Sequence, residues 1–195
     1  MDIINFIEVK TDEVSIEDLN KYHEPEKIFG FCKRCPNYNK IWSCPPHKFE
    51  TSDYIDSYNY CSVVRVKIHI KEESRANKEA KKLSRKISDN IRLYFDKSLI
   101  DIERNFKDTK ALYAGSCLLC NNCTRTNNSP CIKQDKMRYS LEALGFQVSG
   151  ICEMFNDKIL WSSDKLPEYL MFVGAVLSKG KLDSELIKAY IKTGR

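Results

Sequence analysis

Nine cysteines in a chain of 195 residues constrain its structure more than any other feature. An odd number of thiols cannot pair completely within one chain, and seven of the nine fall into two short windows. The first window contains Cys32, Cys35 and Cys44, and the second contains Cys117, Cys120, Cys123 and Cys131. Thiols clustered in this way are typical of metal sites. The sequence therefore predicts two metal loops, near residues 32–47 and 117–131.

Proline residues reinforce this prediction. Four of the six prolines stand at the two windows, namely Pro36, Pro45, Pro46 and Pro130. Proline fixes its own φ and restricts the residue before it, so it stiffens a loop that must hold sulfurs at set distances without regular secondary structure.

The second window has the spacing of an iron–sulfur site. Three cysteines at successive three-residue steps can wrap one face of an iron–sulfur cubane, and Cys131 is the expected fourth ligand. We expect Leu118 and Leu119 to exclude water from the sulfurs. A four-cysteine zinc site is the alternative, but zinc sites usually present two separated Cys-x2-Cys pairs, so the continuous triple favours iron and sulfide.

The first window offers only three thiolates. Its fourth ligand could be Cys61, Cys152 or His47, and the spacing from Cys44 to His47 also fits a zinc site of three cysteines and one histidine. A cluster held by three cysteines alone would leave one iron open to water or substrate.

Periodicity predicts a single α+β domain over residues 1–195, because no repeat or linker divides the chain. We expect strands over 3–9, 60–70, 110–114 and 169–178. We expect helices after the N-cap Ser15 and over 51–58, 73–107, 134–144 and 184–191. The long one is either continuous or two helices joined near residues 88–90, and Gly145 should end the helix over 134–144. The sheet should be mixed or antiparallel and carry the long amphipathic helix and the two metal loops. A ferredoxin-like sandwich is one arrangement that fits.

Two finer expectations follow from these elements. Alternation along residues 60–70 turns Arg65, Lys67 and His69 to solvent. The predicted helix over 134–144 places Arg138 and Glu142 four residues apart, as a surface ion pair or as a support for the second loop.

Charge is concentrated on the long helix. Residues 65–110 carry 14 basic and 8 acidic side chains, a net of +6 against +5 for the whole chain. The aromatic residues here lie on the apolar stripe rather than among the cations, so we expect a solvated helix face and no nucleic-acid partner. Two cubanes with thiolate ligands would also reduce the formal charge by about four.

Common catalytic and targeting signals are absent from the sequence. It has no glycine-rich nucleotide loop, no His-Glu-x-x-His and no Gly-x-Ser-x-Gly. The longest apolar run, residues 169–177, is too short to cross a membrane, and the first residues show no export signal. We therefore expect a cytoplasmic protein without a membrane partner, and we identify no catalytic motif.

The two windows together resemble a family of predicted metal-binding proteins, the domain of unknown function twenty-two eighty-four, found chiefly in anaerobic bacteria and archaea. The residues that carry the resemblance are Cys32, Cys35, Tyr38, Trp42, Cys44, Pro45 and Pro46, then Gly115, Cys117, Cys120, Cys123, Pro130 and Cys131. The resemblance implies metal binding, as iron–sulfur clusters, and implies no reaction.

The hypothesis that follows is an iron–sulfur protein, with one or two clusters of the 4Fe-4S type, that transfers electrons to a redox partner protein or serves as an oxidoreductase component. The alternative is a zinc-stabilised binding module that contacts nucleic acid or an acidic protein. A third hypothesis is an enzyme that acts at an open iron of the first window.

Overall fold

The computed structural model describes residues 3–77, 79–162 and 164–194. Four strands form one sheet: β1 (Ile4–Ser15), β2 (Tyr60–Ile70), β3 (Thr109–Leu112) and β4 (Tyr169–Ser178). The α-helices are α1 (Ile16–Asn20), α2 (Pro25–Cys32), α3 (Thr51–Ile55), α4 (Ala80–Asn105), α5 (Val148–Met154) and α6 (Ser184–Tyr190). Three short 3₁₀ turns complete the fold: η1 (Glu72–Ser74), η2 (Thr124–Asn127) and η3 (Glu142–Leu144). The α+β prediction is confirmed.

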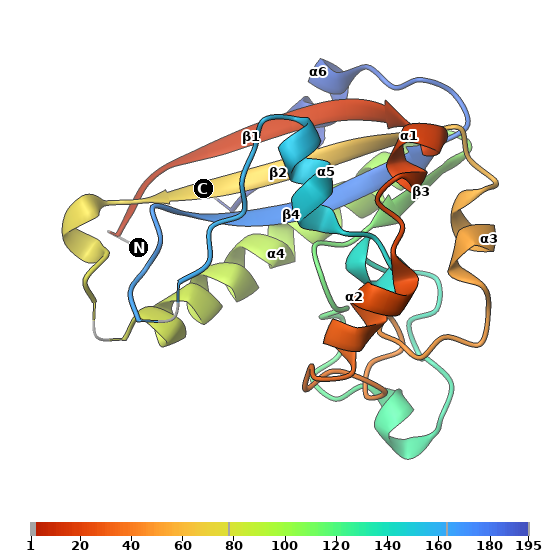
Figure 1. Cartoon of the computed structure of the whole chain (residues 1–195), viewed down its shortest axis with the longest axis horizontal. Helices are drawn as coiled ribbons and strands as arrows, with labels where there is room; N and C mark the ends of the chain where they lie inside the picture. Colours follow the sequence, from red (N-terminus) through yellow and green to blue (C-terminus); the bar gives the residue numbers. More distant parts are fainter. Residues whose placement is uncertain (1–2, 78, 163, 195) are drawn as a thin grey trace.

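The sheet has the order β1-β2-β4-β3, and each neighbouring pair is antiparallel. Since β2 and β3 both run antiparallel to β4, they are parallel to each other and are connected through α4 (Figure 1). This split β–α–β unit also occurs in ferredoxin-like folds. In this chain, however, helices cover both faces of the sheet.

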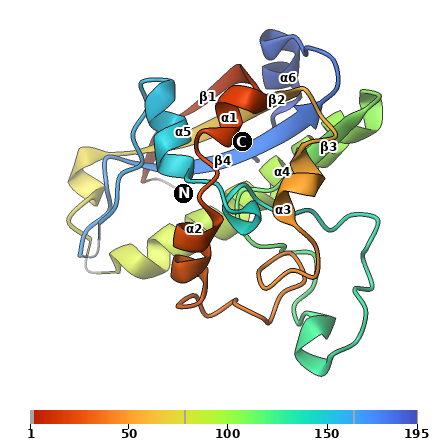
Figure 2. The ribbon, with the colours of Figure 1, turned by 45° about the vertical axis from the view of Figure 1, so that its right-hand side comes forward.

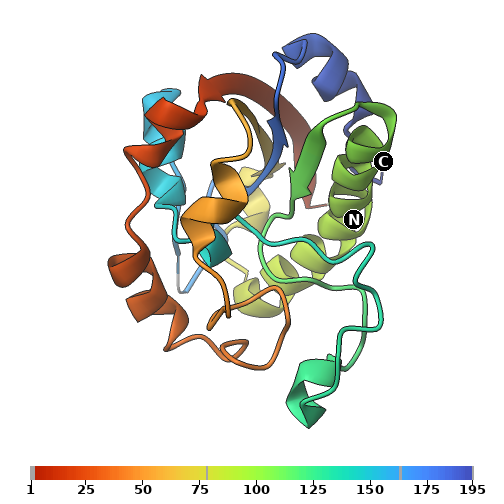
Figure 3. The same cartoon turned by 90° about the vertical axis from the view of Figure 1, so that its right-hand side faces the viewer.

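Each face of the sheet packs against its own set of helices, as Figure 3 shows with the sheet seen from its end. On one face, β2 residues such as Val64 and Val66 form a buried core with Phe95 and Leu99 of α4 and Ile187 of α6. On the other face, a second core joins the sheet to α1, α3 and α5. Figure 2 shows α2 and α5 on this second side of the sheet.

The expectation that Arg65, Lys67 and His69 face solvent is wrong. Arg65 is only 1% exposed, because the coil after α5 covers this face and brings Asp157 to both Arg65 and Lys67. His69 is partly buried, and its ring stacks on Phe6 with centroids 4.0 Å apart. The alternation predicted that Arg65 and Lys67 would contact solvent, but they contact the buried carboxylate of Asp157 instead.

The predicted helix over residues 134–144 is also wrong, since only η3 forms within it. The chain here runs beside β3, where the Tyr113 N–H donates to the Tyr139 carbonyl at 2.8 Å. Arg138 pairs with Glu103 of α4, Nη2 to Oε1 at 2.5 Å, and not with Glu142. Gly145 ends η3 instead of the predicted helix, with φ at 93°.

Helix α4 is continuous through residues 88–90 and begins at Ala80, later than the predicted 73. Ser15 caps α1 as expected, because its hydroxyl accepts from the Asp18 N–H at 3.0 Å. Among the described residues, no helix has both the length and the apolar character needed to cross a membrane.

Candidate metal centre

The first cysteine window begins where α2 ends. Cys32 is the last residue of this helix, and the Cys35 N–H donates back to its carbonyl at 2.9 Å. A second turn closes with the Cys44 N–H on the Ile41 carbonyl, also at 2.9 Å. Successive turns of this kind fold a loop back on itself, so that cysteines far apart along the loop can meet.

In the first window, neighbouring thiols help to raise the pKa of Cys32 and of Cys44. Burial raises the pKa of the Cys44 thiol to about 11, and the neighbouring Cys35 and Cys32 thiols add to that rise. Burial also raises the pKa of Cys32, with further contributions from Cys35 and Glu142. Contributions of this kind act only over a short range, so Cys35 and Cys32 lie near enough to Cys44 to interact electrostatically.

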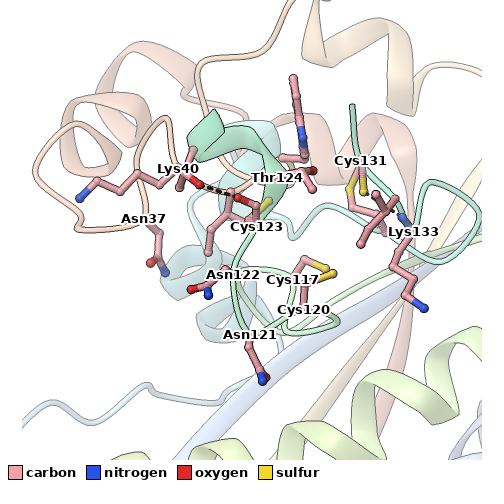
Figure 4. Close-up of a pocket in the computed structure, with 15 residues that line it drawn as sticks. Asn37, Lys40, Cys117, Cys120, Asn121, Asn122, Cys123, Thr124, Cys131 and Lys133 are labelled. Carbon is pink, nitrogen blue, oxygen red and sulfur yellow. Dashed lines mark hydrogen bonds between the residues drawn. The ribbon is translucent and has the colours of Figure 1, made fainter. Parts of the chain in front are cut away.

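The second window surrounds a cavity. Its four cysteines line a space of about 300 Å³, and Figure 4 shows the sulfurs of Cys117 and Cys120 turned to the same side of that space. Asn37, Lys40 and Trp42 of the first window line it as well. The cavity therefore lies where the two loops meet.

Backbone N–H groups donate to the sulfurs of this cavity. Burial raises the pKa of Cys117, the Leu119 N–H opposes the rise, and the other three thiols of the window add to it. The Lys133 N–H donates to the Cys131 Sγ at 3.4 Å. N–H groups aimed at sulfur are the usual surroundings of thiolates that hold iron–sulfur clusters.

One arginine joins the two windows. Arg125 lies between Cys123 and Cys131 in sequence, yet its guanidinium donates to the carbonyls of Ile41 at 3.0 Å, Cys44 at 2.5 Å and Pro46 at 2.7 Å. It also lies over the Trp42 ring, 5.1 Å from the centroid. Sequence reasoning missed this residue, although a lone arginine inside the cysteine loop was the available signal.

Three further hydrogen bonds hold the loops together. The Cys117 N–H donates to the Ser43 hydroxyl at 2.8 Å, and the Trp42 indole N–H donates to the Ser129 carbonyl at 3.1 Å. The Asn37 amide donates to the Ser116 hydroxyl at 3.2 Å. All three views of the ribbon place the two loops side by side at one end of the molecule (Figures 1, 2 and 3).

The candidate fourth ligands of the first window lie in different surroundings. Cys61 and Cys152 are fully buried in the core of the second sheet face, and the Cys152 Sγ lies 3.8 Å from the Met171 Sδ. His47 donates from Nε2 to the Ala143 carbonyl at 2.6 Å and packs against Phe49 and Tyr139. Burial lowers the pKa of His47, and in the neutral ring with this hydrogen bond Nδ1 carries no proton.

Leu118 and Leu119, which we expected to exclude water from the sulfurs, do not line the cavity of the second window. They are 47% and 38% exposed, and with Leu93 of α4 they line a separate groove of about 290 Å³. Arg92 of α4 lines the same groove and donates to the Ser116 carbonyl at 2.5 Å. The second loop is therefore also bound to α4.

The donor set fits a metal cofactor, since both groups consist of thiols and the second also has N–H donors to sulfur. Across residues 3–77, 79–162 and 164–194, no three or more His, Cys, Asp or Glu side chains already have the arrangement that would hold a metal ion.

A family model described as a predicted metal-binding protein (DUF2284) matches residues 18–178 of this chain. The matched span contains both cysteine windows, Arg125 and the residues that join the two loops. A search of curated proteins found no match, and a search of solved structures found none either.

Proposed function

The chain belongs to the family of predicted metal-binding proteins (DUF2284), and from this we propose that it is an iron–sulfur protein that transfers electrons. We assign one cluster of the 4Fe-4S type to the second window. Its ligands would be Cys117, Cys120, Cys123 and Cys131. The first window, with Cys32, Cys35 and Cys44, would contribute to a second cluster.

The observation that carries this proposal is the size of the cavity that the four thiols of the second window line together with neighbouring residues. A zinc ion lies about 2.3 Å from each thiolate, which draws the four sulfurs close together around one atom. A cubane instead needs a space several atoms wide between its ligands. The cavity of about 300 Å³ has room for the larger group.

A bound cluster would supply one-electron redox chemistry, and the chain would set its properties. N–H groups of Leu119 and Lys133 donate to the sulfurs, which disperses negative charge and makes the reduced form easier to reach. The Lys40 and Lys133 side chains line the cavity and add positive charge. A cluster of net charge −2 would be stabilised there.

We propose the groove beside the second loop as the docking face for the redox partner. Exposed apolar side chains of Leu93, Leu118 and Leu119 line it, and Lys97, Arg104 and Lys136 supply positive charge around them. An apolar centre with a cationic border fits an acidic electron-carrier protein. Leu118 and Leu119 stand between Cys117 and Cys120 in the sequence. A partner docked on them would therefore deliver its electron close to the proposed cluster.

Charge reversal on α4 tests the docking face. We expect Lys97→Glu to lower the second-order rate of electron transfer from a reduced, acidic flavodoxin by about tenfold at low salt, because steering is lost. The control is Lys86→Glu, which places the same charge on an exposed position of α4 away from the groove. Equal rates for the two variants would contradict this docking face.

Metal analysis tests the cofactor itself. Protein purified without oxygen should be brown, contain iron and acid-labile sulfide in equal amounts, and lose much of its visible absorption on reduction, because thiolate-to-iron charge transfer gives these clusters their colour. Zinc is colourless and has no redox chemistry. Colourless protein with stoichiometric zinc at both windows would overturn the proposal and support the zinc-stabilised module.

A further inference from the structure

A second cavity lies beside the first cysteine window, between α2, η3, the beginning of α5 and β4. Its volume is about 590 Å³, which is within the range of small-molecule sites. Side chains of the cavity come from helix, coil and sheet, so several elements fix its shape. Its main apolar lining residues are Ile28, Phe31, Phe146, Val148, Trp161 and Met171.

The cavity has a buried interior and an aromatic opening. Ile28, Phe146 and Val148 are almost fully buried. In contrast, Phe31 is 54% exposed and Trp161 is 86% exposed. A flat ligand that covers these exposed aromatic rings would remove their apolar surface from water, which favours binding. The body of the ligand should therefore be aromatic or apolar.

One carboxylate enters this apolar space. Glu142 lines the cavity, and its Oε2 is buried without a hydrogen-bond partner among the described residues. Burial raises the pKa of Glu142, and hydrogen bonds from its own backbone and from Ser140 offset only part of that rise. An acceptor that is buried and unpaired costs free energy, which a donor on a ligand would recover.

The cations near this carboxylate are already bound to other groups. Lys27, which also lines the cavity, pairs with Glu24 at 2.6 Å. Arg92 binds Asp96 at 2.8 Å and the Ser116 carbonyl. The cavity thus presents a carboxyl oxygen with which neither of these two cations pairs.

We propose that this cavity binds a small molecule with an aromatic or apolar body and a primary amino group, which donates to Glu142. A cationic N–H donor supplies the missing hydrogen bond and favours the ionised form of the carboxyl group, whereas an anionic ligand would oppose it. Phe31 directly precedes Cys32, so the ligand would lie beside the first cysteine window. The site is independent of which metal the cysteines hold.

Three compounds with the same ring test the proposal by calorimetric titration of the protein purified without oxygen: tryptamine, indole and indole-3-propionate. We expect tryptamine to bind at least tenfold more tightly than indole, and indole-3-propionate to bind most weakly. Glu142→Gln should remove the preference for tryptamine and leave indole unchanged. The matched control is Glu153→Gln, at an exposed position of α5, which should keep the preference.

A second variant keeps the test decisive if Glu142→Gln does not fold. Trp161 is exposed, so Trp161→Ala should leave the fold and the metal content intact and weaken tryptamine and indole alike, by about fivefold. Absence of tryptamine binding to the unmodified protein at millimolar concentration would overturn the proposal. Equal binding of the three compounds, or a tryptamine preference that survives in folded Glu142→Gln, would overturn it too.

Discussion

At the scale of single residues, Arg125 connects the two metal loops. Its planar guanidinium donates to three carbonyls of the first loop, and a lysine cannot reproduce that fork. We expect Arg125→Lys to lower the free energy of unfolding by about 1–3 kcal/mol, because carbonyls lose their donors, and to reduce the metal content of the first window. Denaturant titration and metal analysis measure both effects. The control is Arg85→Lys on the exposed side of α4, and equal behaviour of the two variants would contradict this role.

The ion pair of Glu103 and Arg138 makes the free energy of unfolding depend on pH in the acid range. Burial tends to raise the pKa of Glu103, but hydrogen bonds from Arg138 and the Ala111 N–H outweigh it, so the pKa is lowered on folding. A lowered carboxyl pKa contributes stability above the unfolded value of about 4.3, and this stability is lost as pH falls through the folded value. Glu103→Gln should therefore flatten the fall in unfolding free energy below about pH 4.5.

Urea titrations between about pH 7 and pH 3, in protein of the same metal content, measure this difference. Glu185→Gln is the control, since that side chain is 82% exposed on α6. If unmodified protein and Glu103→Gln lose stability in parallel over this range, the ion pair with Arg138 is not the source of the acid sensitivity.

At the scale of elements, α4 packs on β4 at a glycine. A Cβ on Gly174 would lie 2.6 Å from Leu99 Cδ1 and 3.1 Å from Phe95 Cζ, and both side chains are fully buried. Gly174→Ala should lower the free energy of unfolding by about 1–3 kcal/mol through overpacking. Gly180→Ala, where nothing lies within 4 Å of the added Cβ, should change it by only a few tenths. Equal unfolding curves for the two variants would contradict this packing.

Elements with a strong local pattern were predictable. Strands β2 and β4 have the predicted bounds, because runs of β-branched and apolar residues mark a buried strand without reference to the rest of the chain. Strand β1 extends beyond the predicted residue 9 to Ser15, since pairing with β2 stabilises its polar second half. The cysteine windows were visible for the same reason, because their spacing is local.

Features that depend on distant contacts were not predictable. The helix expected over residues 134–144 does not form, and Arg138 pairs instead with Glu103, which is 35 residues away. Helices α2 and α5 are short, so their local patterns are weak. The roles proposed for Arg125, which joins the two loops, and for Glu142, which lines the second cavity, likewise depend on contacts between segments that are distant in sequence.

At the scale of the whole molecule, the fold brings two loops about 80 residues apart in sequence to one end of the sheet. They are joined by hydrogen bonds, yet only the thiols of the second loop line the cavity where they meet. Thiols of its own loop, Cys35 and Cys32, add to the raised pKa of Cys44. In the same way, Cys120, Cys123 and Cys131 add to the raised pKa of Cys117. We infer from this separation that each loop holds its own cofactor within a common scaffold.

Replacement of one thiol in each group tests that inference. Cys120→Ser should remove the cofactor of the second window and leave the first, so that iron per chain falls by about half if each window holds a cubane. Cys44→Ser should give the complementary loss. Cys61→Ala, in the buried core, should keep both cofactors, because its thiol lies outside both groups. Loss of all iron from folded Cys120→Ser protein would show instead that the two loops share ligands, as two-cluster ferredoxins do, and the common scaffold would then enclose one coupled centre.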